Sequence, residues 1–401
     1  MSRWPLRKNH RHPKSHRFPL LPPLSGGSRA ETPEALTPRR ARGSALAAAF
    51  RALTTLARLR GRKSGERGLT ASRNLLRAES GENFNEGISV TAPATTSLEN
   101  FDRMSIRAAE KVITSYSTSF SFATHILEPE LRTDIRNLYA MVRTADEIVD
   151  GTARAAGLTT SQTAELLADY EREVLLAPTQ RLHVDPVMHA YAISARRCQF
   201  KEEHVRAFFA SMRRDISSVN YNADEDYRSY IYGSAEVIGL MCLSAFLVQR
   251  PSSPHRGADQ RAHHYSQKDL DIMSEGARAL GAAFQKVNFL RDWQEDATQL
   301  GRHYFPGAPR RLTDSFKRTI IADIRTDLAA ALRAIPLLPG SAPVGVAAAA
   351  ELFAELTNIL DTMSAAEIME KRASVPISTK ARIMARALIK ARKFHPLTHG
   401  R

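Results

Sequence analysis

The chain has 401 residues, 43% of them hydrophobic, which is enough for one large folded domain or two ordinary ones. Its net charge of +15 lies mainly in the first 100 residues, which carry 18 Lys or Arg against 7 Glu and no Asp, whereas the remainder carries 39 against 35. The presence of only two cysteines argues against a disulfide framework and for a reducing compartment. No apolar run approaches the ~18 residues of a membrane span, and no secretory signal follows the basic N-terminus.

Residues 1–103 are predicted to form a basic, low-complexity and disordered extension, because Arg, Pro, Gly, Ser and Thr dominate them. Within this extension, residues 44–59 combine an apolar helical face with scattered Arg, as in an interfacial helix on anionic lipid. Chance periodicity in a disordered tail is the preferred interpretation. Further interpretations are an organellar transit peptide and a true start codon downstream, for instance at Met104. A nucleic-acid-binding tail is another, although the extension lacks the interleaved aromatic residues of such tails.

From Ile106 onward the pattern becomes helical. Pro129 marks the start of a helix, since Pro fits the first helical turn, and Gly151 marks its end. Further helices are predicted at Ser161–Leu176, Pro186–Cys198, Lys201–Ile216 and Val344–Met363, with a basic helix after Pro376. No alternation typical of strands is sustained, so the expected fold class is all-α with one domain over residues 104–395.

The helix that ends at Gly151 carries a polar stripe opposite an apolar one. The stripe has spacings of four, three and four residues and consists of Tyr139, Arg143, Asp146 and Asp150. Residues at these spacings share one helix face. Two acids one turn apart, with an Arg beside them, therefore point in one direction.

A second helix, expected over Glu275–Thr298, repeats this arrangement. Its polar stripe consists of Gly281, Gln285, Asn288, Asp292 and Asp296, with Arg291 beside the first acid. The other faces are apolar. A helix of this kind is expected to line a polar cavity inside a helical protein.

Stacked carboxylates repel one another unless cations lie between them. Divalent metal is the simplest explanation, because Mg²⁺ takes oxygen ligands and is bound through one or two carboxylates together with substrate phosphate. Arg143 and Arg291 would then hold phosphate oxygens. The alternative for a single pair of acids is a solvated helix face, but two such pairs, each with its own Arg and its own apolar stripe, favour a site.

A further stretch, Tyr227–Met241, places Tyr230 on a stripe with apolar neighbours. Gly233 and Gly239 within it would let another helix or a ligand approach the backbone closely.

Five segments together resemble the squalene/phytoene synthase family, whose members have the isoprenoid synthase fold, an all-α bundle around a central cavity. The segments are Tyr-Ser-Thr-Ser-Phe (116–120), Leu-Tyr-Ala-Met-Val-Arg-Thr-Ala-Asp-Glu-Ile-Val-Asp-Gly (138–151), Tyr-Ile-Tyr-Gly-Ser-Ala-Glu-Val-Ile-Gly-Leu-Met (230–241), Gln-Lys-Val-Asn-Phe-Leu-Arg-Asp-Trp-Gln-Glu-Asp (285–296) and Gly-Arg-His-Tyr-Phe-Pro (301–306). The tail Lys371-Arg-Ala-Ser-Val-Pro-Ile-Ser resembles the family more weakly. The first acidic motif has Glu147 where many members have Asp, a form familiar among phytoene synthases. As a whole, the sequence most resembles the bacterial phytoene synthases of this family.

The resemblance implies a head-to-head condensation of two geranylgeranyl diphosphates, through a cyclopropylcarbinyl diphosphate, to phytoene in carotenoid biosynthesis. It implies Mg²⁺, with Mn²⁺ as an alternative, and no NADPH. The residues that match the family's metal-binding acids are Asp146, Glu147, Asp150, Asp292 and Asp296. Those that match its substrate-binding positions are Ser117, Ser119, Tyr139, Arg143, Gln285, Asn288 and Arg291. Tyr230 joins the four aspartates as an expected catalytic residue.

Three alternatives stay open. A farnesyl diphosphate-using enzyme of the same family would make squalene or dehydrosqualene, and pocket depth would distinguish it. A non-catalytic, membrane-associated assembly factor of the same fold is disfavoured because both acid motifs are intact. Nucleic-acid binding through the basic extension is not expected. Insoluble substrate tails and products predict a cytoplasmic protein bound peripherally to a membrane surface, next to downstream carotenoid enzymes.

Overall fold

The computed structural model describes residues 96–216, 224–248, 265–296 and 302–394, all of which belong to one compact unit over residues 83–401. The described part is built from helices and contains no β-strand. The helices in chain order are α2 (Ser97–Tyr116), α3 (Thr118–Thr124), α4 (Pro129–Val149), α5 (Thr152–Ala155), α6 (Thr160–Leu176), α7 (Pro186–Cys198), α8 (Glu202–Asp215), α9 (Asp224–Ile231), α10 (Val237–Leu247), α11 (Gln267–Arg291), α12 (Trp293–Glu295), α13 (Asp314–Ala334), α14 (Ala342–Thr362), α15 (Ala365–Glu370) and α16 (Ile377–Phe394).

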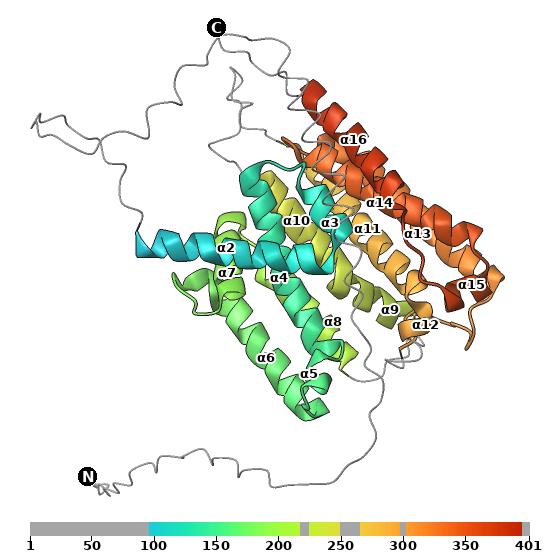
Figure 1. Cartoon of the computed structure of the whole chain (residues 1–401), viewed down its shortest axis with the longest axis horizontal. Helices are drawn as coiled ribbons and strands as arrows, with labels where there is room; N and C mark the ends of the chain where they lie inside the picture. Colours follow the sequence, from blue (N-terminus) through green and yellow to red (C-terminus); the bar gives the residue numbers. More distant parts are fainter. Residues whose placement is uncertain (1–95, 217–223, 249–264, 297–301, 395–401) are drawn as a thin grey trace, which may run out of the picture. The chain divides into compact units, whose positions relative to one another are not determined.

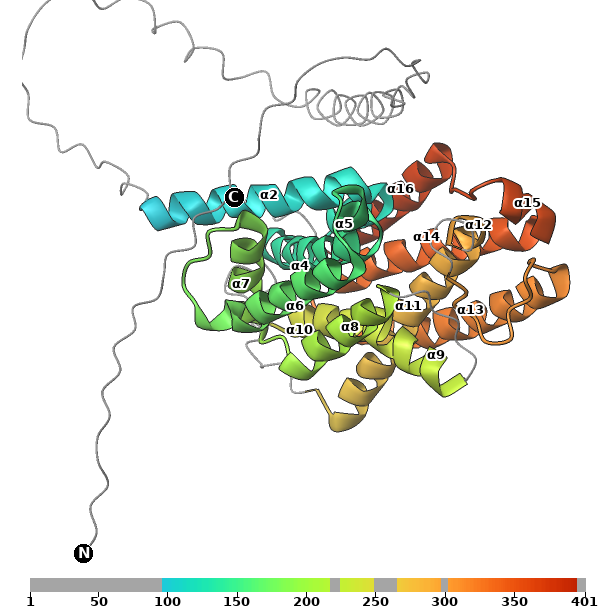
Figure 2. The ribbon, with the colours of Figure 1, turned by 90° about the horizontal axis from the view of Figure 1, so that it is seen from below.

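Figure 1 shows α2, α4, α6 and α7 on one side of the bundle, α13, α14 and α16 on the other, and α10 and α11 between them; Figure 2 shows the same order from below. Two apolar cores correspond to these sides. One joins α4, α6, α7, α8 and α10, and the other joins α9, α11, α13, α14, α15 and α16. The two acid-bearing helices, α4 and α11, therefore belong to different cores.

Local chemistry explains where these helices begin and end. Pro129 starts α4, and Gly151 follows it with a φ of 111°, a left-handed conformation that favours glycine, so both predicted ends are confirmed. The predicted start of the second acid helix at Glu275 is wrong. α11 begins at Gln267, because Ser266 and Asp269 form a reciprocal capping box. It also ends earlier than expected, at Arg291.

Two glycines allow the segment from α9 to α10 to pack closely against neighbouring helices. Between α9 and α10 the chain forms one π-helical turn, η3 (Tyr232–Glu236). A Cβ added at Gly233 would collide with Ala207 and Ser211 of α8, and one added at Gly239 would collide with Ala277 of α11. The close approach predicted for these two glycines is therefore confirmed as helix packing.

Gly281, which begins the predicted polar stripe, lets another helix approach α11 closely. An added Cβ there would collide with the carbonyl of Ala235 in η3. The stripe therefore starts where α11 packs against η3.

Two segments, Asp224–Leu247 and Ala342–Thr362, are long and apolar enough to cross a membrane by length and composition. The sequence alone predicts no such segment. About half of each apolar window is buried inside the bundle, where Met241 and Leu360 are fully buried, as in the core helices of a compact protein.

Candidate active site

The first acidic motif lies at the end of α4, where Arg143 reaches two acids. Its guanidinium lies 3.9 Å from Asp146 Oδ2 and donates a hydrogen bond to Glu147, which also accepts from Thr152. The Arg143 guanidinium carbon lies 4.4 Å from the centre of the Tyr116 ring. Although partial burial raises the pKa of Glu147, these hydrogen bonds lower it below its usual value. Glu147 is thus held as a carboxylate by neighbours on α4 and α5.

Asp146 has the opposite electrostatic environment. Burial and the nearby carboxylate of Asp150 raise its pKa to about 8, and Arg143 opposes this only in part. Its side chain is nevertheless 31% exposed. Asp146 is therefore a partly accessible acid that would gain from a nearby cation.

The second motif is divided by a helix break. Asp292 is the C-terminal capping residue of α11, and the backbone N–H of Asp296 donates to the carbonyl of Asp292 at 2.9 Å, so the two acids stay one turn apart. Asp292 accepts from Arg291 Nε at 2.9 Å and from Arg372 Nε at 2.7 Å. Burial alone would raise the pKa of Asp292, but these two arginines lower it. Burial and Asp292 raise the pKa of Asp296 to about 7.

Arg302 connects the two motifs. Its guanidinium donates to Asp150 Oδ1 at 2.9 Å, to the carbonyl of Val149 at 3.0 Å and to the carbonyl of Asp215 at 2.6 Å. Its backbone N–H donates to the carbonyl of Asp296 at 3.0 Å. The side chain is only 4% exposed. One buried cation therefore ties the ends of α4 and α8 to the chain that follows the second motif.

The acids of the two motifs influence each other electrostatically. Asp150 raises the pKa of Asp296, and Arg302 lowers it. The pKa of Asp146 is raised by Asp215 as well as by Asp150. The first and second acidic motifs thus lie in one region, which is called the acidic region below.

Asp215 is a buried acid that the sequence analysis does not identify. Its carboxylate accepts the Tyr230 hydroxyl at 2.9 and 3.0 Å, and burial raises its pKa to about 7. A signal was present in the sequence. Met212 follows Phe208 by four residues and Asp215 follows Met212 by three, so an acid occupies the apolar stripe of α8. Arg302 and Arg372 lie in segments already noted for their resemblance, but their contacts cannot be deduced from spacing.

Tyr230 lies in the core and contacts Asp215. It is 1% exposed, its ring lies 5.5 Å from that of Tyr304 and 6.1 Å from that of Phe289, and its hydroxyl is bonded to Asp215. This geometry suits a residue that positions Asp215.

The remaining predicted residues surround the two motifs. Ser117 caps α3 by accepting the backbone N–H of Phe120 at 3.1 Å and shares a hydrogen bond with Tyr139, whose pKa burial raises. Gln285 and Asn288 are partly exposed on α11, within two turns of Asp292. Ser119 lies in α3, but its side chain is outside the described part of the chain.

An aromatic cluster adjoins the polar residues. Its members come from α3, α4, α11 and α14 and are Phe120, Tyr139, Phe284 and Phe353. Ring centres lie 6.2 Å apart for Phe120 and Tyr139, 5.6 Å for Phe120 and Phe284, and 3.8 Å for Phe284 and Phe353. Tyr139 also shares a hydrogen bond with Ser117, so this aromatic cluster adjoins predicted substrate-binding residues.

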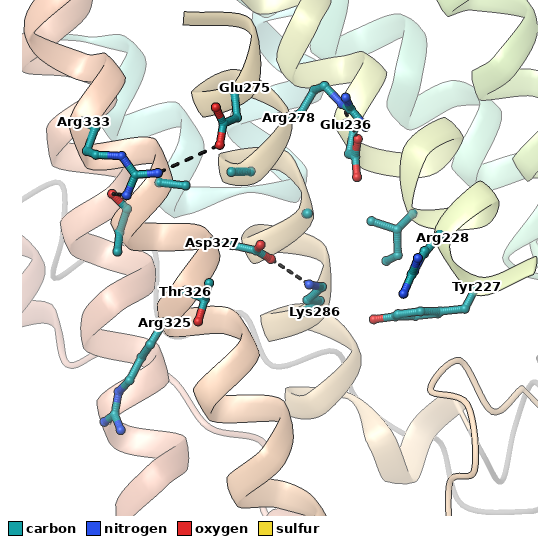
Figure 3. A pocket seen from close by; sticks show the side chains of 15 residues that line it. Tyr227, Arg228, Glu236, Glu275, Arg278, Lys286, Arg325, Thr326, Asp327 and Arg333 are labelled. Carbon is teal, nitrogen blue, oxygen red and sulfur yellow. Dashed lines mark hydrogen bonds and ion pairs between the residues drawn. The ribbon is translucent and has the colours of Figure 1, made fainter. Parts of the chain in front are cut away.

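A separate groove of about 720 Å³ lies between α9, α11 and α13 (Figure 3). None of the predicted site residues lines it. Lys286 on its floor is bonded to Asp327 at 2.7 Å and to Asp323 at 2.6 Å, and Arg278 at its edge is bonded to Glu236 at 2.6 Å. These charges are paired across neighbouring helices, and no acid of the two motifs contributes to the groove.

The donors in the acidic region suit a hard divalent cation. They are carboxylate oxygens, and the pKa of Asp146 and of Asp296 is raised partly by neighbouring acids, a repulsion that a cation would relieve. Within the described ranges, no three His, Cys, Asp or Glu side chains are already gathered around one metal position. Arginines occupy several of these carboxylates instead, and metal binding would exchange partners.

Comparisons with known proteins agree with this site. A family model described as squalene/phytoene synthase matches residues 113–378. Phytoene synthase from Arthrospira platensis is 30% identical over 203 residues, 50% of this chain and 61% of that protein. 15-cis-phytoene synthase from Paracoccus sp. is 28% identical over 203 residues, 50% of this chain and 60% of that protein. The chain thus spans about three fifths of the length of these curated relatives.

The fold has a counterpart among solved structures. A crystal structure of a dehydrosqualene synthase in complex with a ligand has a TM-score of 0.58 and 20% sequence identity, and the match covers 74% of this chain and 100% of that one. The predicted all-α isoprenoid synthase fold is confirmed. Since the family model covers well over half of the sequence, the chain belongs to the squalene/phytoene synthase family.

Proposed function

We propose that this chain is a prenyltransferase that condenses two geranylgeranyl diphosphates head to head, through a cyclopropylcarbinyl diphosphate, to phytoene, with release of diphosphate. Similarity to proteins named phytoene synthase supports the choice of reaction. The observation that carries the proposal is the convergence of two acid pairs and four arginines on one region, linked by the buried Arg302.

The arginines would bind the diphosphate groups. Arg143, Arg291 and Arg372 each contact an acid of the region, and their side chains are 26%, 21% and 64% exposed. A guanidinium offers paired donors that suit phosphate oxygens. Charge stabilisation of a departing diphosphate lowers the barrier to its departure. We assign these three arginines to that task.

The acids would hold the metal. Members of this family are typically dependent on divalent metal, and we assign Mg²⁺, with Mn²⁺ as an alternative, to Asp146, Glu147, Asp150, Asp292 and Asp296. When bound, such a cation neutralises diphosphate charge and favours ionisation of the allylic substrate. Each carboxylate oxygen of Glu147 already accepts a hydrogen bond, from Arg143 or from Thr152, and these donors compete with a cation, so we expect Glu147 to contribute less than Asp146.

The aromatic cluster would shelter the reactive carbocation. An allylic cation is captured by water unless water is excluded, and aromatic ring faces stabilise positive charge. The Phe120 ring lies 6.2 Å from that of Tyr139, which shares a hydrogen bond with Ser117, so apolar surface adjoins residues that we assign to the substrate. We further propose that Ser117, Ser119, Tyr139, Gln285 and Asn288 orient the substrates, and that Tyr230 acts through Asp215.

Substrate length is the finer part of the proposal. Farnesyl diphosphate is the alternative substrate, and it would give a C30 product. We propose that residues 104–395 form the catalytic domain, that no NADPH is needed, and that the protein is a cytoplasmic, peripheral membrane enzyme beside downstream carotenoid enzymes.

Product analysis tests the proposal. The purified full chain is given Mg²⁺, detergent and either geranylgeranyl or farnesyl diphosphate, with and without NADPH, and the hydrocarbons are separated. A C40 hydrocarbon from the longer substrate without NADPH is the expected result. A C30 product from the shorter substrate alone would replace the substrate assignment. No product from folded protein would indicate a non-catalytic member of the family.

A further inference from the structure

Helix α16 presents apolar side chains on both of its faces. It lies along the outside of α14 (Figures 1 and 2) and turns Ile383, Met384 and Ala387 into the core. Its other side exposes Leu388 and Ile389 by 43% and 56%. An aliphatic surface that the core does not need therefore remains open on the outermost helix of this side.

The same helix is strongly basic. Between Ile377 and Phe394 there are six Lys or Arg and no acid. The basic residues are Lys380, Arg382, Arg386, Lys390, Arg392 and Lys393. Arg386 is bonded to Glu351 at 2.9 Å, and its side chain is still 55% exposed. Basic residues interspersed with exposed aliphatic ones are typical of helices that lie on an anionic lipid surface.

The helix begins next to the acidic region. The segment that precedes it carries Arg372, which contacts Asp292. Lys380, in the first turn of α16, is close enough to Arg291 for that charge to lower its pKa, in addition to the larger effect of burial. α16 also contacts α3, the short helix that carries Phe120 of the aromatic cluster. A surface bound to α16 would therefore lie near the acidic region and the aromatic cluster.

We infer that the outer face of α16, centred on Leu388 and Ile389 and flanked by the exposed Arg382 and Arg386, docks on an anionic lipid bilayer. The benefit of such docking rests on the proposed function, because a prenyl diphosphate is stored in a bilayer and its hydrocarbon product dissolves there. The docking itself needs no catalysis. It can therefore be tested separately from the reaction.

Another exposed apolar surface is a weaker candidate. The connection between α6 and α7 exposes Leu182 by 57% and Val184 by 92%. It carries both Arg181 and Asp185, so it lacks the one-sided charge of α16. Charge complementarity to anionic lipid selects α16.

A local probe tests the inference in the full chain. The variant Ile389→Cys is labelled with an environment-sensitive NBD fluorophore; Cys198 is buried and burial raises the pKa of Cys242 to about 12, so the introduced thiol is the reactive one. The matched control is Leu332→Cys on α13, because Leu332 is 57% exposed and Ile389 is 56% exposed. Vesicles contain either phosphatidylcholine alone or equal parts of phosphatidylcholine and phosphatidylglycerol.

With the anionic vesicles, the fluorescence of the label at position 389 is expected to brighten and to shift to shorter wavelength. With phosphatidylcholine alone, this label should respond weakly. The fluorescence of the label at position 332 should stay unchanged with both kinds of vesicle. Equal responses of the two labels, or none at position 389, would overturn the inference. A response at position 389 to protein concentration without vesicles would also overturn it, by assigning this face to a second copy of the chain.

A second experiment links docking to turnover. The double variant Leu388→Gln, Ile389→Gln is expected to lower co-sedimentation with the anionic vesicles by about tenfold, because it removes two aliphatic side chains from the bilayer contact. Leu332→Gln should leave binding unchanged. Both variants should retain wild-type turnover in detergent. An inactive wild type that still binds vesicles would reject the proposed function alone, whereas an active wild type with unaltered binding by the double variant would reject the docking face.

Discussion

Removal of the Arg302 guanidinium offers the sharpest test of how the two acidic motifs are held together. Arg302→Met keeps most of the side-chain volume but removes the donors to Asp150 and to the carbonyls of Val149 and Asp215. Breaking a buried ion pair costs about 3–5 kcal/mol, and each buried carbonyl left without a donor costs about 1 kcal/mol. Because Asp150 is 38% exposed and regains water, we take the lower end of the first range and, with the two carbonyls, expect a total of about 5 kcal/mol.

Urea unfolding followed by circular dichroism measures this effect. With m near 3 kcal/mol/M, the midpoint should fall by more than about 1 M. The matched control is Arg325→Met, since Arg325 is bonded to Asp361 at 2.8 Å but is 52% exposed, and such a pair contributes less than about 1 kcal/mol. Equal midpoint shifts for the two variants would refute the view that Arg302 is the central structural cation of the site.

Three further outcomes are expected. Asp146→Ala should abolish turnover while circular dichroism shows an intact helical fold; a rate near that of the wild type would contradict the metal assignment. The raised pKa values of Asp146 and Asp296, about 8 and about 7, mean that protons compete with metal below these values, so Mg²⁺ affinity should increase as pH rises from 6 to 8 and then level off. Calorimetry in two buffers of different ionisation enthalpy should detect the released protons, and a pH-independent affinity would count against it. Asp102→Ala should lower the free energy of unfolding by about 1–3 kcal/mol, since the buried His189 loses its partner at 2.7 Å, and an unchanged urea midpoint would contradict this reading.

Some of the site was predictable because it depends on local geometry. The stripe from Tyr139 to Asp150 follows from the 3.6-residue period of a helix, and Pro129 and Gly151 set its ends through their own backbone preferences. The start of α11 was equally local, since Ser266 and Asp269 form a capping box three residues apart, but the polar sequence before Glu275 obscured it.

Chain-distant contacts depend on tertiary packing. Arg302 reaches Asp150 across 152 residues, and Arg372 reaches Asp292 across 80. No periodicity connects such positions, because their separation is decided by how whole helices pack.

The helical class, the two acidic stripes and the family can be inferred from the amino-acid sequence, because each depends on short spacings and motifs. Tertiary packing places Asp215 in the acidic region, bonds the Tyr230 hydroxyl to it, and packs Gly281 against η3. These features escape prediction because burial and charge compensation are collective. A carboxylate's environment depends on every element that surrounds it, and those elements meet only in the folded chain.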